Sequence, residues 1–201
     1  MIAGVVVPLL DALPLHSAWP PLLWIFLVLA YALLGATIIA HEKRHMGLNQ
    51  TLGYLLSSLF TFFTVVALGK LVYELVHLHG HKMEGGELLT WAALLWVSNI
   101  LVFALWYWRL DAGGPNARDH RIHHRCGEFL FPQMTMDEAM LGGPWRPGFV
   151  DYLFLAFNTS TALSPADTAA LGRYAKLAMM AQALISLTII VLIAARGVNI
   201  L

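Results

Sequence analysis

Four stretches of the chain are long and apolar enough to cross a membrane, and they limit its possible folds more than any other feature. They cover residues 21–40, 51–77, 88–107 and 177–195. A helix needs about 20 mainly apolar residues to cross the hydrocarbon core of a bilayer. The composition agrees, because 59% of the residues are hydrophobic and 12% are charged. The sequence therefore predicts an all-α integral membrane protein with four transmembrane helices.

The balance of charge excludes some partners. Twelve Lys and Arg residues match twelve Asp and Glu residues, so the net charge gives no reason to expect nucleic acid as a partner. No nucleotide-binding glycine loop or serine-nucleophile elbow occurs, so we expect neither an enzyme nor a cofactor. A chain of 201 residues forms one compact bundle, and an aqueous path has to be shared between several copies. The expected partners are therefore the lipid bilayer and further copies of the chain.

The segment before the last span is the most informative one. Residues 147–161 are apolar enough to enter a membrane but too few to cross it, and a polar turn containing Pro165 follows. Non-helical backbone at membrane depth is tolerated where protein buries it or where it lines water. The sequence therefore predicts a re-entrant half-helix between the third and fourth spans, which is the outline of a pore loop.

The end of this half-helix carries a resemblance to a known family. Its last residues, Asn158 to Thr161, contain two threonines, and Asp167 follows after a short turn. This pattern resembles the pore module of tetrameric cation channels of the potassium-channel superfamily, from residue 149 to the C-terminus. The resemblance implies a homotetrameric ion channel that conducts cations. The residues that it places at the pore and filter are Thr159, Thr161, Ala162, Leu163, Ser164, Pro165, Ala166 and Asp167.

The filter-like turn departs from the family in its glycines. The family uses two glycines so that successive backbone carbonyls face the ion path. This chain has Ser164 and Ala166 at those places, with Pro165 between them, and proline has a fixed φ and no N–H. We therefore expect no potassium-type carbonyl filter. A wider, hydrated constriction with a ring of Asp167 would favour cations by charge and discriminate weakly among them.

The last span offers a candidate inner pore. Met179, Gln182 and Ser186 are spaced so that they share one face of a helix, which favours either a pore-facing stripe or ordinary helix packing. Arg173 and Lys176 precede the span. They anchor it to lipid headgroups in one interpretation, and in the other they face the axis, oppose cations and leave anion permeation open.

The sequence also predicts how the chain is divided. Residues 1–87 form an N-terminal arm and two peripheral transmembrane helices, whereas residues 88–201 form the pore-like module. Asn99 in the third span is expected to hydrogen-bond a neighbouring helix. The distribution of Lys and Arg places the re-entrant loop on the cytoplasmic side, but the channel resemblance places it outside. The whole chain is similar to a group of bacterial membrane proteins, which implies a multi-pass protein of the bacterial inner membrane.

Clusters of histidine provide an alternative. His41 and His45 have the spacing HxxxH, and residues 120–124 have the spacing HxxHH, as in the histidine boxes of membrane desaturases and hydroxylases. Imidazole is a good ligand for iron or zinc, and an i, i+4 pair on a helix can share one metal. In this alternative the metal ligands are His41, His45, His120, His123 and His124. Solvated loop histidines, a pH-sensing gate and a pore-like scaffold that does not conduct also stay open.

Overall fold

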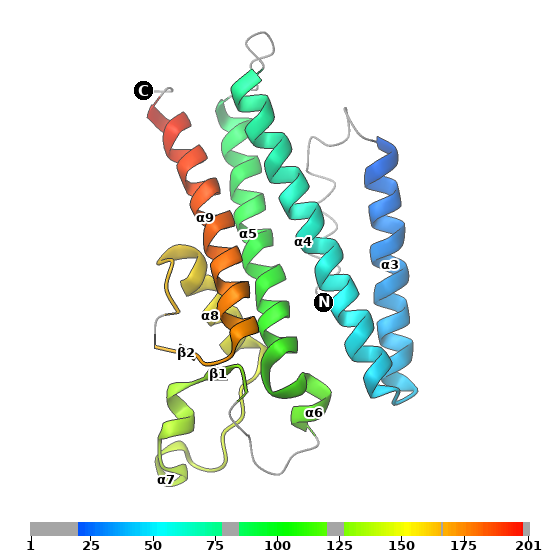
Figure 1. Cartoon of the computed structure of the whole chain (residues 1–201), viewed down its shortest axis with the longest axis vertical. Coiled ribbons are helices and arrows are strands. Elements are labelled where there is room, and N and C mark those ends of the chain that lie inside the picture. Colours follow the sequence, from blue (N-terminus) through cyan, green and yellow to red (C-terminus); the bar gives the residue numbers. More distant parts are fainter. Residues whose placement is uncertain (1–19, 78–84, 120–126, 166, 199–201) are drawn as a thin grey trace. The chain divides into compact units, whose positions relative to one another are not determined.

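The computed structural model describes residues 20–77, 85–119, 127–165 and 167–198. Four long helices dominate it, and their labels are those of Figure 1. They are α3 (Pro20–Glu42), α4 (Met46–His77), α5 (Gly85–Leu110) and α9 (Arg173–Val198). Each contains a candidate membrane span, which confirms the prediction of an all-α, multi-pass membrane protein. The helices extend beyond the predicted stretches because backbone hydrogen bonding continues through the polar residues that end an apolar run.

The chain forms two compact units. One unit covers Asn99–Val191, and the other contains the residues before and after it. The helices α5 and α9 contribute to both units. The predicted pore-like module, which begins at residue 88, is defined by function rather than by compactness, and its boundary stays a prediction.

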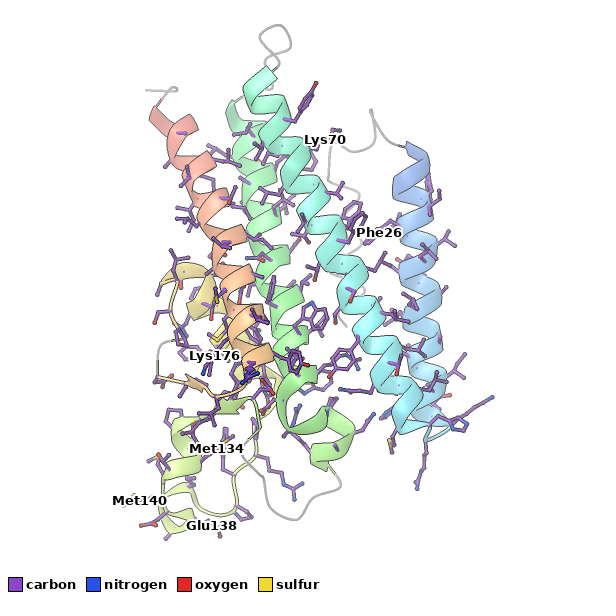
Figure 2. The ribbon with its side chains drawn as sticks, viewed as in Figure 1. Phe26, Lys70, Met134, Glu138, Met140 and Lys176 are labelled. Carbon is purple, nitrogen blue, oxygen red and sulfur yellow. The ribbon has the colours of Figure 1, made fainter. Side chains whose placement is uncertain are left out.

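A helical hairpin of α3 and α4 makes up most of the first unit. Phe26 lies in its apolar core and packs against Phe63, with ring centroids 4.1 Å apart. Figure 2 shows Phe26 on the side of α3 that faces α4. Near the connecting turn, the side-chain amide of Asn49 donates to the carbonyl oxygen of Thr37 over 2.8 Å. Apolar contacts therefore hold α3 and α4 together along most of their interface.

The second unit connects the end of α5 to α9 through a series of short elements (Figure 1). They are η1 (Asp111–Gly113), α6 (Pro115–Asp119), β1 (Phe129–Leu130), η2 (Pro132–Thr135), α7 (Glu138–Leu141), α8 (Phe149–Thr161) and β2 (Ala169–Ala170). The two strands pair antiparallel, with Phe129 opposite Ala170. This pairing fastens the segment after α6 to the residues just before α9.

The helix α8 occupies the segment for which we predict a half-helix. It has 13 residues, and Asp151 stabilises its first turn by accepting a hydrogen bond from the N–H of Gly148 over 2.7 Å. A helix of this length spans about 20 Å, which is less than the thickness of a hydrocarbon core. Its buried residues lie on one face and are Tyr152, Leu155, Ala156, Thr159 and Ser160. That α8 enters a membrane stays a prediction.

Candidate functional site

The turn that follows α8 is exposed along much of its length. Its exposed residues include Ala162, Leu163 and Asp167, and Thr161, the last residue of α8, is exposed beside them. Polar oxygen is therefore present on the surface at both ends of the turn, as the hydroxyl of Thr161 and the carboxylate of Asp167. The carboxylate gives the turn a negative charge.

The other residues predicted at the filter are less accessible. Ser164 and Pro165 are half-buried, and Ala166 lies outside the described residues. Thr159 is 2% exposed, and its hydroxyl donates to the carbonyl oxygen of Leu155 over 2.8 Å. Thr159 therefore belongs to the packed face of α8, whereas Thr161, whose hydroxyl donates to the carbonyl oxygen of Phe157 over 2.9 Å, is the exposed last residue of that helix.

Two polar side chains of α9 hold the C-terminal half of α8. The hydroxyl oxygens of Ser160 and Ser186 are 2.6 Å apart, and the amide nitrogen of Gln182 donates to the carbonyl oxygen of Ala156 over 2.8 Å. Both α9 residues are fully buried. Since Ser186 is near the middle of α9, the end of α8 lies beside the middle of that helix and not beside either end.

The helix α5 completes this buried network. The hydroxyl of Tyr107 donates to the side-chain oxygen of Gln182, and the amide of Asn99 donates to the hydroxyl of Ser186 over 2.7 Å. The prediction that Asn99 bonds a neighbouring helix is confirmed. Hydrogen bonds between side chains on the packed faces therefore join α5, α8 and α9 within this unit. We call these contacts of Asn99, Tyr107, Ser160, Gln182 and Ser186 the polar network.

The stripe predicted as an inner pore lies on this packed face. Met179 is 8% exposed, and Gln182 and Ser186 have no exposed surface. The bonds of the two polar residues match the helix-packing interpretation of the stripe. Within this unit they present no atom to an aqueous path, and a role in conduction stays a prediction.

A second polar cluster surrounds the carboxylate of Asp111, just after α5. Asp111 is fully buried, and its carboxylate accepts three hydrogen bonds: from the Tyr152 hydroxyl over 2.6 Å and from the N–H groups of Glu128 and Phe129 over 2.8 and 3.2 Å. Burial and the negative charge of Asp111 raise the pKa of Tyr152, so its hydroxyl stays protonated and donates. Asp111 therefore connects the end of α5 to α8 and to β1.

Arg118 packs against the same cluster. Its guanidinium donates to the carbonyl oxygens of Trp108 and Asp111 over 2.8 and 2.7 Å and lies 5.0 Å from the ring centroid of Tyr152. Gly127 approaches so closely that a Cβ there would lie 2.3 Å from a carboxylate oxygen of Asp111. Glycine is therefore needed where the segment before β1 passes Asp111.

Glu128 fixes the start of α9. Its carboxylate accepts the N–H of Ala175 over 3.1 Å, and its carbonyl oxygen accepts the N–H groups of Leu171 and Gly172 over 2.8 and 3.2 Å. The first N–H groups of a helix have no partner within the helix, and a carboxylate is favourable at that end. Arg173 and Lys176 are exposed on the same turn, where Figure 2 labels Lys176.

Sequence reasoning does not identify most of these residues. Those that it misses are Tyr107, Asp111, Arg118, Glu128 and Tyr152. Their partners are far away along the chain, so no local spacing reveals them. The one available signal is that Asp111 and Arg118 are charges next to the end of an apolar span, where a buried charge needs a partner. Together, the polar network and the cluster around Asp111 position α8 and the turn after it.

His41 and His45, at the turn between α3 and α4, do not lie on one helix. His41 lies in the last turn of α3, which ends at Glu42, and Arg44 has a φ of 55° before α4 begins. His41 and His45 are therefore not an i, i+4 pair on one helix, and a metal site at these residues stays a prediction. The other alternative ligands, His120, His123 and His124, lie outside the described residues. Among the described residues, no group of three or more His, Cys, Asp or Glu side chains could hold a metal ion.

Comparison with known proteins identifies no relative of this chain. No family model, curated protein or solved structure matches the chain. A functional proposal for this chain therefore depends on its own residues and contacts.

Proposed function

We propose that the protein is a homotetrameric channel that conducts cations past the turn after α8. The observation that carries this proposal is the contact between Ser160, at the end of α8, and Ser186, near the middle of α9. From that point the chain returns to the start of α9, where Glu128 binds the N–H of Gly172. In a pore loop, a short helix reaches the middle of a spanning helix, and the segment after it returns to the end of that helix.

The chemistry of the turn supports cation conduction. Thr161 offers a hydroxyl and Asp167 a carboxylate, both exposed, on a segment that the polar network holds in place. Four copies of Asp167 around one axis form a ring of negative charge, which attracts cations and repels anions. Pro165 and the lack of glycine argue against a carbonyl ladder, so weak discrimination among cations is expected.

The buried stripe of α9 has a different role in this proposal. Gln182 and Ser186 bond α5 and α8 instead of facing ions. The path is therefore lined by the turn itself, with Thr161, Ser164 and Asp167 as its polar residues. We place the channel in the inner membrane of a bacterium, as the resemblance stated from the sequence implies.

The test is ion flux through purified protein in liposomes under sodium, potassium and chloride gradients. Wild-type protein is expected to pass both cations and to exclude chloride. Asp167→Asn removes the ring of negative charge and is expected to reduce cation flux about tenfold, which corresponds to about 1.4 kcal/mol in barrier height. Asp137→Asn is the matched control, because Asp137 is also exposed but lies just before α7.

Two results would contradict the proposal. Equal flux through wild type and Asp167→Asn would remove the carboxylate from the ion path. Absence of flux, together with iron or zinc bound in a fixed ratio to the same purified sample, would favour the histidine-box alternative.

A further inference from the structure

Leu163, the second residue after α8, has an unusual backbone conformation. Its φ is 52°, in the left-handed region that glycine or asparagine normally occupies after a helix. The last helical hydrogen bond of α8 comes one residue earlier, where the N–H of Ala162, just after the helix, donates to the carbonyl oxygen of Asn158 over 2.8 Å. A left-handed conformation costs an L-residue with a bulky side chain free energy that glycine would not lose.

Packing inside the chain does not account for this leucine. Its side chain is 43% exposed, so a large part of its apolar surface makes no contact within the chain. The turn would be less strained with glycine. Strain that persists at an exposed turn is a reason to look for a role outside the local fold.

The base of the turn is fixed, and Leu163 follows it as a partly exposed residue. Three residues before Leu163, the hydroxyl of Ser160 bonds Ser186, and the carbonyl of Ala156 accepts the amide of Gln182. Two hydrogen bonds on the packed face thus prevent the end of α8 from moving away from α9. The apolar side chain is therefore presented at a defined position, between the exposed Thr161 and Asp167.

We propose that Leu163 forms an apolar constriction that limits ion flow through the turn after α8. This inference rests on the channel function proposed above. Four copies around one axis place apolar side chains beside the hydrated oxygens of Thr161 and Asp167. A narrow apolar ring favours the loss of water from a pore, and ions then cross it less readily. Leu163 sets how much current passes, whereas Asp167 sets the sign of the permeant charge.

Three variants separate apolarity from backbone conformation. Leu163→Asn and Leu163→Gly both suit a positive φ, and neither restores an apolar side chain. Both are expected to raise sodium and potassium flux in liposomes about tenfold, equivalent to about 1.4 kcal/mol. Leu163→Met keeps a large apolar side chain and is expected to conduct as wild type does. Val150→Ala shortens an apolar side chain at the start of α8 that is more exposed than Leu163, and its flux is expected to be unchanged.

The outcomes are distinguishable. If wild type conducts and Leu163→Asn and Leu163→Gly conduct at the same rate, Leu163 is only a strained turn residue and the constriction is wrong, while the channel function stands. In that case the two variants change the melting temperature but not the flux. If neither wild type nor any of the variants conducts, the channel function and the constriction are both wrong.

Discussion

The two helix contacts that dominate the two units are built in different ways. In the hairpin of α3 and α4, Phe26 packs against Phe63 in an apolar core. In the second unit, the short helix α8 is held by hydrogen bonds from Gln182 and Ser186 of α9 and by the bond from Tyr152 to Asp111. The contact between α3 and α4 depends on the packing of apolar side chains, whereas the contacts of α8 depend on hydrogen bonds.

This difference follows from the lengths of the helices. Two spanning helices keep their place because both must cross the hydrocarbon core, and apolar packing then decides how closely they approach. A helix of 13 residues does not cross it, so its depth is not fixed by length. Hydrogen bonds between particular atoms can fix that depth, since sliding α8 along α9 would break them all.

The largest effect is expected for Asp111→Asn. The amide replaces one of two acceptor oxygens with a donor, and it removes the charge that Tyr152 and two N–H groups bond. Hydrogen bonds to charged groups contribute about 1.5–3 kcal/mol each, so we expect a loss of about 3 kcal/mol in unfolding free energy. Unfolding in detergent measures it, and the exposed Asp137→Asn provides the control. Equal stability of Asp111→Asn and Asp137→Asn would contradict the stabilising role of the hydrogen bonds to Asp111.

A smaller loss is expected for Gln182→Leu. The variant leaves the hydroxyl of Tyr107 without its acceptor and the carbonyl of Ala156 without its donor. Interhelical hydrogen bonds in membranes contribute about 0.6–1.7 kcal/mol each, so a loss of about 2 kcal/mol is expected. Thr188→Val removes an exposed hydroxyl that bonds within its own helix. Unfolding of Gln182→Leu and Thr188→Val at the same denaturant concentration would contradict the role of the hydrogen bonds of Gln182.

Gly172→Ala tests the start of α9. A Cβ there would lie 1.7 Å from a carboxylate oxygen of Glu128, so the carboxylate has to move and releases the N–H of Ala175. Loss of a helix cap costs about 1 kcal/mol. Gly47→Ala is the control, because nothing lies within 4 Å of its Cβ and alanine favours the helix. The two substitutions are expected to shift the melting temperature in opposite directions, and a shift in the same direction would contradict the cap.

An effect as small as that at the start of α9 is expected in the first unit. Phe26→Leu keeps an apolar side chain of similar size in the α3–α4 core, and such exchanges usually cost less than about 1.5 kcal/mol. We expect about 1 kcal/mol, from the lost stacking on Phe63. The measurement is again unfolding in detergent. A loss as large as that for Asp111→Asn would mean that shape matters as much here as polar partners do in the second unit.

The spanning helices could be predicted from sequence because the bilayer imposes one simple rule. About 20 apolar residues are required, and α3, α4, α5 and α9 all contain such a run. The position of α8 could be predicted for a related reason, since its apolar run is too short to cross. These features depend on neighbouring residues alone.

The contacts that hold α8 could not be predicted in the same way. Tyr152 and Asp111 are 41 residues apart, and Tyr107 and Gln182 are 75 residues apart. Neither pair forms a spacing that a local pattern contains. Leu163 is among the predicted filter residues, but its left-handed φ is missed for another reason, because such a φ is usually signalled by glycine and leucine gives no such signal.

Thiol accessibility tests most directly the claim that α8 brings a hydrated turn to the middle of the membrane. Thr161→Cys and Leu184→Cys are compared in a Cys126→Ser background with a charged, membrane-impermeant reagent. Thr161 is the exposed end of α8, and Leu184 is 64% exposed on α9, two residues from Ser186. Rapid labelling of Thr161→Cys from one side only, with no labelling of Leu184→Cys, is predicted. If Thr161→Cys stays unlabelled from both sides, the turn is not hydrated and the channel account is wrong.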